Sequence, residues 1–229
     1  MGLIFEYLDF DDLYNFLKSN RVLYSYFQDP DFHFKRKTCI INNSNLRAIN
    51  KFPEWKIMAE AIILESNNIN IFDKFNKKSF RKLTIYSNIT NFKFLSRFSN
   101  LKSLKLEGYY DRPFTSLPTN IDEILVGNGY NQDINEFKYL QKLKKISFGY
   151  IFNKEISLKL LQCLPYLKVI CLENCYSQNI SPLLRFKDLC ILSKCSKSKT
   201  VNLLKNDNLE NVKYIRLSNL TIQSYFKLN

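Results

Sequence analysis

The residues in this sequence that are best suited to chemistry are five cysteines in its C-terminal half. They are Cys163, Cys171, Cys175, Cys190 and Cys195. Closely spaced cysteine thiolates are the usual ligands of structural zinc, but such sites normally combine two close cysteine pairs, often with histidine. The closest pair here, Cys171 and Cys175, is expected to straddle a strand and the turn after it, so the two side chains would point in different directions. We therefore expect no metal site.

No other combination of residues indicates catalysis. The single histidine, His33, has no cysteine, serine or carboxylate at a spacing typical of an active site, and we expect it to be structural, at the end of a helix. Gly127 and Gly129 lack the third glycine and the lysine of a nucleotide-binding loop. The carboxylates are scattered along the chain. The sequence therefore predicts neither an enzyme nor a bound cofactor.

The two glycines belong instead to a segment that occurs twice. VGNGYNQDI at 126–134 and FGYIFNKEI at 148–156 share a glycine, an aromatic residue, an asparagine, an acid and an isoleucine in the same order. Around them, the pattern Leu-x-x-Leu-x-Leu, in which Ile, Val or Phe can replace Leu, recurs about every 22 residues. Its middle positions are Leu83, Leu104, Ile124, Ile146, Ile170, Leu189 and Ile215. A period of this length indicates that one structural unit is being copied.

Each unit predicts one β-strand followed by a turn. In Leu-x-Leu both apolar side chains lie on the same side of a strand, because side chains alternate. One unit carries too little apolar surface to fold alone, whereas stacked units bury a continuous interior. We therefore expect an α/β fold in which residues 80–229 form a leucine-rich-repeat solenoid with a parallel β-sheet on its concave face.

Three positions after four of the predicted strands repeat in residue type. Large apolar residues at two of them should fill the interior behind the sheet, and the short polar residues between them suit a turn, where they bond to loop backbone. The aromatic column is Tyr110, Tyr130, Phe152 and Tyr176; the second apolar column is Phe114, Ile134, Ile156 and Ile180; the polar column is Asp111, Asn131, Asn153 and Ser177.

The residues that choose a partner are expected on the exposed face of this sheet, where the copies differ. A mostly basic column consists of Arg81, Lys102, Asp122, Lys144, Lys168, Lys187 and Lys213. A mixed column consists of Thr84, Lys105, Leu125, Ser147, Cys171, Cys190 and Arg216. The basic column is either a solvated row of charges or a site for an acidic ligand. The mixed column favours a protein partner over a phosphate backbone, whose recognition uses Lys and Arg together with stacking aromatic residues.

The composition limits the location and the partners. The 229-residue chain has a formal charge of +13, with lysine spread along its whole length rather than in one block. This charge raises the probability of an acidic partner. Nucleic acid is one such partner, but it is a weaker hypothesis than a protein target. No apolar run approaches the roughly 20 residues of a membrane span. We expect a soluble monomer of the cytoplasm or nucleus with reduced cysteines.

The first 79 residues depart from the repeat. In residues 1–36, Asp9 or Asp11 can cap a helix with Leu13, Phe16 and Leu17 on one face, and Ser19 or Asn20 can end it. A second amphipathic stretch should end at Asp29-Pro30. Residues 37–79 form a junction, with Trp55 as its anchor. It contains either a helix from Pro53 or a degenerate first strand at residues 61–63, and we favour the strand.

Two parts of the chain resemble known families. Gly127…Tyr130-Asn131-Gln132-Asp133-Ile134, its copy at 148–156 and the Leu117-Pro118 pair resemble FNIP repeats, a leucine-rich-repeat variant of amoebae and the giant DNA viruses that infect them. The order Tyr7-Leu8-Asp9…Asp12-Leu13…Phe16…Arg21…Tyr26…Asp29-Pro30 resembles the F-box without its usual opening Leu-Pro-x-Glu segment.

The resemblances imply a function. F-box modules bind a Skp-type adaptor of a cullin–RING ubiquitin ligase while a repeat domain selects the target. By this resemblance, Leu8, Leu13, Phe16 and Pro30 would contact the adaptor, and a viral chain would act in its host cell. The alternative is a repeat binding module without a ligase link, in which the F-box remnant serves only as an N-terminal cap.

Overall fold

The computed structural model describes residues 8–29, 32–54, 57–86, 88–173 and 176–184, together with three further strands at 190–193, 214–217 and 220–221. The predicted roles of Pro30, Trp55, Cys175, Lys187, Cys195 and Lys213 lie outside the described residues. For the three C-terminal strands the structure describes the backbone alone.

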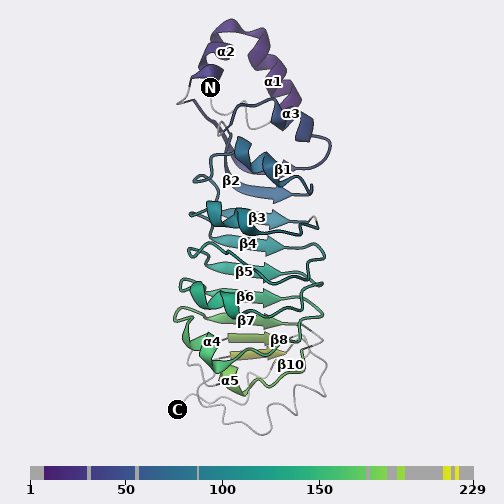
Figure 1. The fold of residues 1–229 in the computed structure, drawn as a ribbon, viewed down its shortest axis with the longest axis vertical. Coiled ribbons are helices and arrows are strands. Elements are labelled where there is room, and N and C mark those ends of the chain that lie inside the picture. Colours follow the sequence, from purple (N-terminus) through teal and green to yellow (C-terminus); the bar gives the residue numbers. More distant parts are fainter. Residues whose placement is uncertain are drawn as a thin grey trace.

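One sheet extends through the described part of the chain (Figure 1). Its strands are β1 (Phe34–Ile41), β2 (Ile57–Leu64), β3 (Lys82–Ile85), β4 (Ser103–Leu106), β5 (Glu123–Val126), β6 (Lys145–Phe148), β7 (Val169–Leu172), β8 (Cys190–Ser193), β9 (Tyr214–Leu217) and β10 (Leu220–Thr221). They lie in sequence order, and each of β1 to β8 pairs in parallel with the next strand. Only β10 is antiparallel to its neighbour. The predicted α/β class with a parallel sheet is confirmed.

The strand pairing follows the repeated pattern through β7. The middle apolar residues of five consecutive units lie directly opposite one another in the sheet, as predicted. These residues are Leu83, Leu104, Ile124, Ile146 and Ile170.

In β8 the predicted register is wrong by two residues. Ile170 pairs with Ile191 rather than Leu189, and Cys171 pairs with Leu192 rather than Cys190. A shift of two residues keeps every side chain on the same face of a strand, so apolar residues at both 189 and 191 satisfy the alternation equally well. The neighbouring strands decide between the two registers.

The N-terminal helices have the predicted bounds. The first, α1 (Phe10–Ser19), begins after Asp9, whose carboxylate accepts a hydrogen bond of 2.8 Å from the Asp12 N–H. Asn20 ends it and also caps α2 (Arg21–Gln28), because its Oδ1 accepts from the N–H groups of Val22 and Leu23 at 3.1 Å each. Short polar side chains therefore cap the first turn of both helices, as the N-cap preference predicts.

The junction differs from the prediction in two respects. The degenerate first strand is confirmed, because β2 places Ile62 opposite Leu83. However, a further strand, β1, precedes it and begins at Phe34, inside the predicted helical module, so His33 stands before a strand and not at a helix end. The short helix here is α3 (Leu46–Asn50), not one starting at Pro53. β1 has no clear alternation in FKRKT, and its pairing with β2 decides its conformation.

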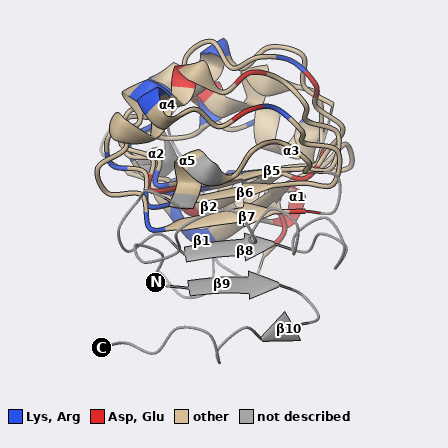
Figure 2. Ribbon diagram, turned by 90° about the horizontal axis from the view of Figure 1, so that it is seen from below, with Lys and Arg blue, Asp and Glu red and all other residues tan. Residues whose placement is uncertain are grey.

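The core lies on one face of the sheet. The second and fourth residues of β3 to β7 are buried on this face. Short helical segments cover it between the strands, and Figure 2 shows α4 and α5 together on that side. These segments are η2 (Ile69–Lys74), η3 (Lys93–Arg97), η4 (Asn135–Tyr139), α4 (Leu158–Gln162) and α5 (Ser181–Leu184). They contribute buried residues such as Phe72, Leu95 and Phe137.

The aromatic column is buried behind the sheet, as predicted, and its rings form a continuous stack. Ring centroids are 6.1 Å apart for Tyr110 and Tyr130, 6.3 Å for Tyr130 and Phe152, and 6.1 Å for Phe152 and Tyr176. The Tyr130 hydroxyl donates to the carbonyl of Asp133 at 3.1 Å, so this buried polar group is satisfied within its own turn. Burial raises the pKa of Tyr110 to about 12 and also raises the pKa of Tyr130.

Close stacking of the turns depends on glycine. A Cβ on Gly149 would lie 2.4 Å from the carbonyl carbon of Gly127, and a Cβ on Gly127 would lie 2.4 Å from the carbonyl oxygen of Leu106. Both obstacles are backbone atoms, which cannot rotate away. The repeated glycine therefore serves the approach of one turn to the next rather than a ligand.

The polar column joins each turn to the previous one. The Asn131 N–H donates to Asp111 Oδ1 at 2.8 Å, the Asn153 N–H to Asn131 Oδ1 at 2.9 Å, and the Ser177 N–H to Asn153 Oδ1 at 2.8 Å. The expectation that these side chains bond to loop backbone is confirmed. Each bond crosses from one unit to the next, so the column extends the backbone pairing of the sheet into the turns.

Replacing Asn153 by alanine should lower the free energy of unfolding by about 1 kcal/mol or more, because the Ser177 N–H loses its acceptor. Asn153→Asp keeps an oxygen at this position, as Asp111 does in its own turn, and should recover most of the loss. Urea denaturation of the two variants measures the difference. Equal urea midpoints for Asn153→Ala and the original chain would show that the hydrogen bonds of the polar column contribute nothing to stability.

Candidate functional site

The sheet leaves one face without a covering layer in the described part of the chain. On β3 to β7 the first and third residue of each strand point away from the core, and we call these ten residues the open face. They are Lys82, Thr84, Ser103, Lys105, Glu123, Leu125, Lys145, Ser147, Val169 and Cys171. Most are partly exposed, because neighbouring strands flank them at about 4.8 Å.

The open face consists of two columns, of which the sequence predicted one. The predicted mixed column is confirmed, because Thr84, Lys105, Leu125, Ser147 and Cys171 lie opposite one another. The second column is formed by the first residue of each strand. The Leu-x-x-Leu-x-Leu pattern does not single it out, because only one of its variable positions lies between the two buried residues of the strand. The same alternation rule, extended back by two residues, would have found it.

The predicted column member in β8 is wrong. Leu192, not Cys190, pairs with Cys171, and Cys190 lies opposite Val169. Arg216 pairs with Leu192 and therefore continues the mixed column into β9, as predicted.

The basic column lies immediately before the strands. Hydrogen bonds fix its backbone: the Arg81 carbonyl accepts from the N–H groups of both Lys102 and Ser103, at 2.8 and 3.0 Å. The same pair of hydrogen bonds to one carbonyl recurs in the following units through β7. The column is therefore in register along the sheet although it lies outside the strands. Its described members are Arg81, Lys102, Asp122, Lys144 and Lys168.

Two carboxylates interrupt the positive charge, and lysines of the next unit pair with both. Lys145 Nζ lies 2.8 Å from Glu123 Oε1, and Lys144 Nζ lies 3.7 Å from Asp122 Oδ2. The hydrogen bond to Glu123 raises the pKa of Lys145. By contrast, Arg81, Lys102 and Lys168 form no ion pair with any residue that the structure describes.

The N-terminal candidates lie apart from the open face and differ in exposure. Leu13 is fully buried in the chain's own core, and Leu8 is partly buried against it. The Leu8 carbonyl accepts from the Arg36 guanidinium at 2.6 Å. Phe16 is 45% exposed. In this conformation, therefore, Phe16 alone of these three presents a large apolar surface.

The described residues contain no arrangement typical of metal or membrane sites. No group of three or more His, Cys, Asp or Glu among them could hold a metal ion. Cys163 and Cys171 are half-buried free thiols, and burial raises the pKa of Cys39 to about 12. None of the described helices has the length and apolar character of a membrane span.

Glu123→Gln should lower the pKa of Lys145 toward its ordinary value, because the charged acceptor is lost. The sign follows from the raised pKa: the pair's stabilisation is complete below the ordinary pKa of lysine and is lost as the pH rises through the folded value. NMR titration of the lysine side chain measures this shift. Glu155→Gln, which removes a carboxylate from another turn, should leave the pKa of Lys145 unchanged; an equal effect would exclude a direct pair.

A scan against protein-family models and a search of curated proteins find no match to this chain. The resemblance to FNIP repeats and the F-box therefore depends on the residues quoted above.

Proposed function

We propose that this chain is a non-enzymatic protein-interaction module: a leucine-rich-repeat solenoid that holds a protein target on its open face. One observation carries the proposal, namely that the two faces of the same strands differ. The second and fourth residues of each strand are buried and uniformly apolar. The first and third residues are mostly partly exposed and change in type from strand to strand. A surface built on a constant scaffold with variable side chains suits recognition of one specific partner.

The solenoid reading is supported by the register and by the turns. Units of about 22 residues each contribute one parallel strand, one aromatic ring to the stack and one polar bond to the next unit. A protein target is supported by the chemistry of the open face. From β3 to β7 it contains small, aliphatic and charged side chains and no aromatic residue on which a base could stack.

A second candidate function adds a ubiquitin-ligase link. In this proposal, the N-terminal helices dock a Skp-type adaptor and the chain selects substrates for a cullin–RING ligase. The support is the exposed apolar surface of α1 and α2, where Phe16 is 45%, Val22 65% and Tyr24 38% exposed.

The same helices also support the cap alternative. Phe10, Leu13 and Leu17 of α1 are buried, and the Phe10 ring meets Phe52 edge-on at 5.6 Å. Lys51 Nζ lies 2.7 Å from Asp11 Oδ1 across this contact. The apolar face of α1 is thus engaged by its own chain at the β1 end of the sheet. Capping is compatible with adaptor binding, because the exposed residues lie on other faces of the helices.

The open face is tested by capture from an amoebal cell extract, the cell type that the FNIP resemblance implies. Leu125 is the one large aliphatic residue in the mixed column of β3 to β7, and Leu125→Glu should abolish the capture of any protein that the original chain retains reproducibly. Tyr139→Ser removes an exposed side chain from the covering layer and should capture the same protein at an unchanged level. Retention of the protein by Leu125→Glu would exclude the open face as its binding site.

The ligase link is tested by pull-down of a purified Skp-type adaptor with the full chain. The double variant Phe16→Glu, Val22→Glu should lose binding at least tenfold, because two exposed apolar contacts become charged. Lys18→Glu, Ser25→Ala changes exposed residues on the same two helices and should bind as the original chain does. If the original chain binds no adaptor, the ligase candidate is rejected and the cap alternative stands.

A further inference from the structure

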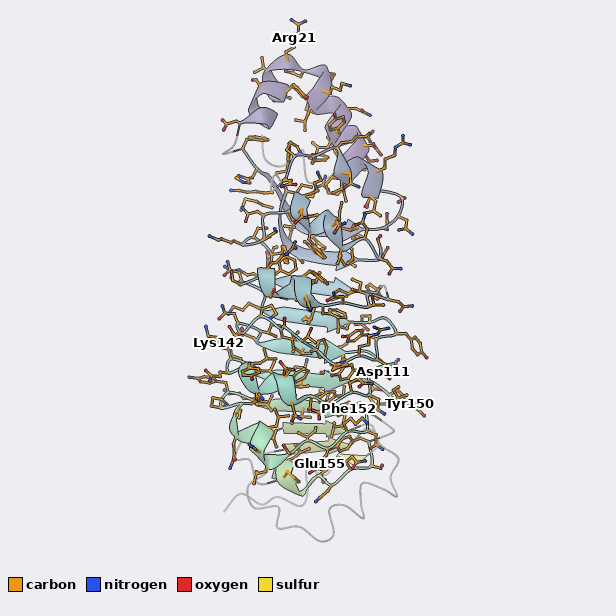
Figure 3. All side chains as sticks on the ribbon, viewed as in Figure 1. Arg21, Asp111, Lys142, Tyr150, Phe152 and Glu155 are labelled. Carbon is orange, nitrogen blue, oxygen red and sulfur yellow. The ribbon has the colours of Figure 1, made fainter. Side chains whose placement is uncertain are left out.

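Charge is distributed unevenly between the two edges of the sheet. We define the strand-start edge as residues 77–82, 99–103, 119–123, 141–145 and 165–169, which lead into β3 to β7. It contains nine lysines and arginines and only two carboxylates. The strand-end edge, formed by the turns that follow the same strands, has the opposite balance. Its charged residues are Glu107, Asp111, Arg112, Asp133, Lys154, Glu155 and Glu173. Figure 3 shows Lys142 and Asp111 on opposite sides of the sheet.

Within the described chain, three of the nine cations of the strand-start edge pair with carboxylates, namely Lys77 with Asp73, Lys144 with Asp122 and Lys145 with Glu123, and the charge of the others is not compensated by an ion pair. Lys142 Nζ donates to the neutral side chain of Asn120 at 2.7 Å, which leaves its charge in place. Parallel pairing repeats such cations along the sheet at intervals of about 4.8 Å. Asp122 and Glu123 interrupt the row at β5, but the excess of cations on either side of β5 creates a local positive potential that favours an acidic ligand.

The size of the row and its surroundings favour a polypeptide. From β3 to β7 there are four strand spacings, about 19 Å in total, which an extended segment of about six residues would span. The edge continues directly into the open face, where small and aliphatic side chains such as Ser147, Val169 and Leu125 adjoin the cations. A mixed surface of this kind suits an acidic segment that also carries apolar side chains. Single-stranded nucleic acid would use aromatic stacking, for which the open face of these strands has no side chain.

We infer that the strand-start edge of β3 to β7 binds an acidic, extended segment of the protein target, with carboxylates on the basic row and apolar side chains on the open face. The inference rests on the proposed function, because it assigns the chemistry of the partner at that same surface. The acidic segment complements the basic column of this edge, in which Arg81, Lys102 and Lys168 form no ion pair with a described residue.

The test uses the full chain and two fluorescein-labelled probes: a peptide of alternating Glu and Val, and its Gln and Val counterpart. Fluorescence anisotropy should show binding of the acidic probe at about 50 mM salt, much weaker binding of the neutral probe, and loss of binding at about 500 mM salt. The triple variant Arg81→Glu, Lys102→Glu, Lys168→Glu should weaken binding at least tenfold. Failure of the original chain to distinguish the two probes overturns the inference.

A matched control separates position from net charge. Lys93→Glu, Lys138→Glu, Lys159→Glu changes the net charge by the same amount on η3, η4 and α4, in the covering layer. It should weaken binding less than twofold; equal weakening by the two triple variants would show a non-specific charge effect and overturn the inference. Should the edge variant fail to fold by circular dichroism, Arg81→Gln, Lys102→Gln, Lys168→Gln replaces it, with the same expected direction.

Three further outcomes separate this inference from the proposed function and from nucleic-acid binding. A labelled thymidine oligonucleotide that binds more tightly than the acidic peptide, and loses binding in the edge variant, overturns the inference in favour of nucleic acid. If the edge variant still captures the protein that Leu125→Glu loses, the proposed function stands and the acidic-segment inference is wrong. If Leu125→Glu and the edge variant both capture the same protein as the original chain, at an unchanged level, both proposals are wrong.

Discussion

Every part of this structure depends on the pairing of one short strand with the equivalent strand of the next unit. From β3 onward the strands in the sheet have only four residues or fewer, and two side chains of each of β3 to β7 enter the core. The free energy gained by burying these two side chains is too small to offset the conformational entropy lost when the whole unit becomes ordered. Parallel pairing at a constant register solves this problem, because the buried residues of adjacent strands then lie side by side. The core is continuous only while that register is kept.

The turns preserve the register by three different contacts. Glycine at 127 and 149 lets the backbones approach, the aromatic stack fills the space behind them, and the polar column bonds one turn to the next. The residues that first attract attention as a glycine-rich site therefore belong to the scaffold. These contacts involve the turns and the inner face of the sheet. The side chains of the open face make none of them, so they can vary without disturbing the register.

The two ends of the sheet pose a different problem from its middle. A parallel sheet without closure leaves an unpaired strand edge at its start, and exposed edges invite association with other chains. Here α1 packs near β1 through Phe10 and Phe52, with Phe34 of β1 completing an aromatic cluster at 5.5 Å from Phe52. The N-terminal helices are thus part of the folded unit rather than an appended tail. Any partner that binds them must use the residues that this packing leaves outside.

The sequence by itself determined the features that follow from local period and from side-chain type. These include the strands from β2 to β7, the aromatic and polar columns, and the limits of α1, where Asp9 and Asn20 act as caps. Such features depend on residues within one unit or one helix, so a single chain read in order reveals them.

Only the tertiary structure decided the features that depend on a neighbouring strand. β1 forms in a segment without alternation because β2 pairs with it. In β8, residues 189 and 191 fit the apolar pattern equally well, so pairing with β7 decides the register and places Ile191 opposite Ile170. The pairing of Lys145 with Glu123 likewise joins two residues that lie about 22 positions apart in the sequence. These residues come together only when the units stack. The sequence of one unit does not indicate which residue of the next unit will lie beside it.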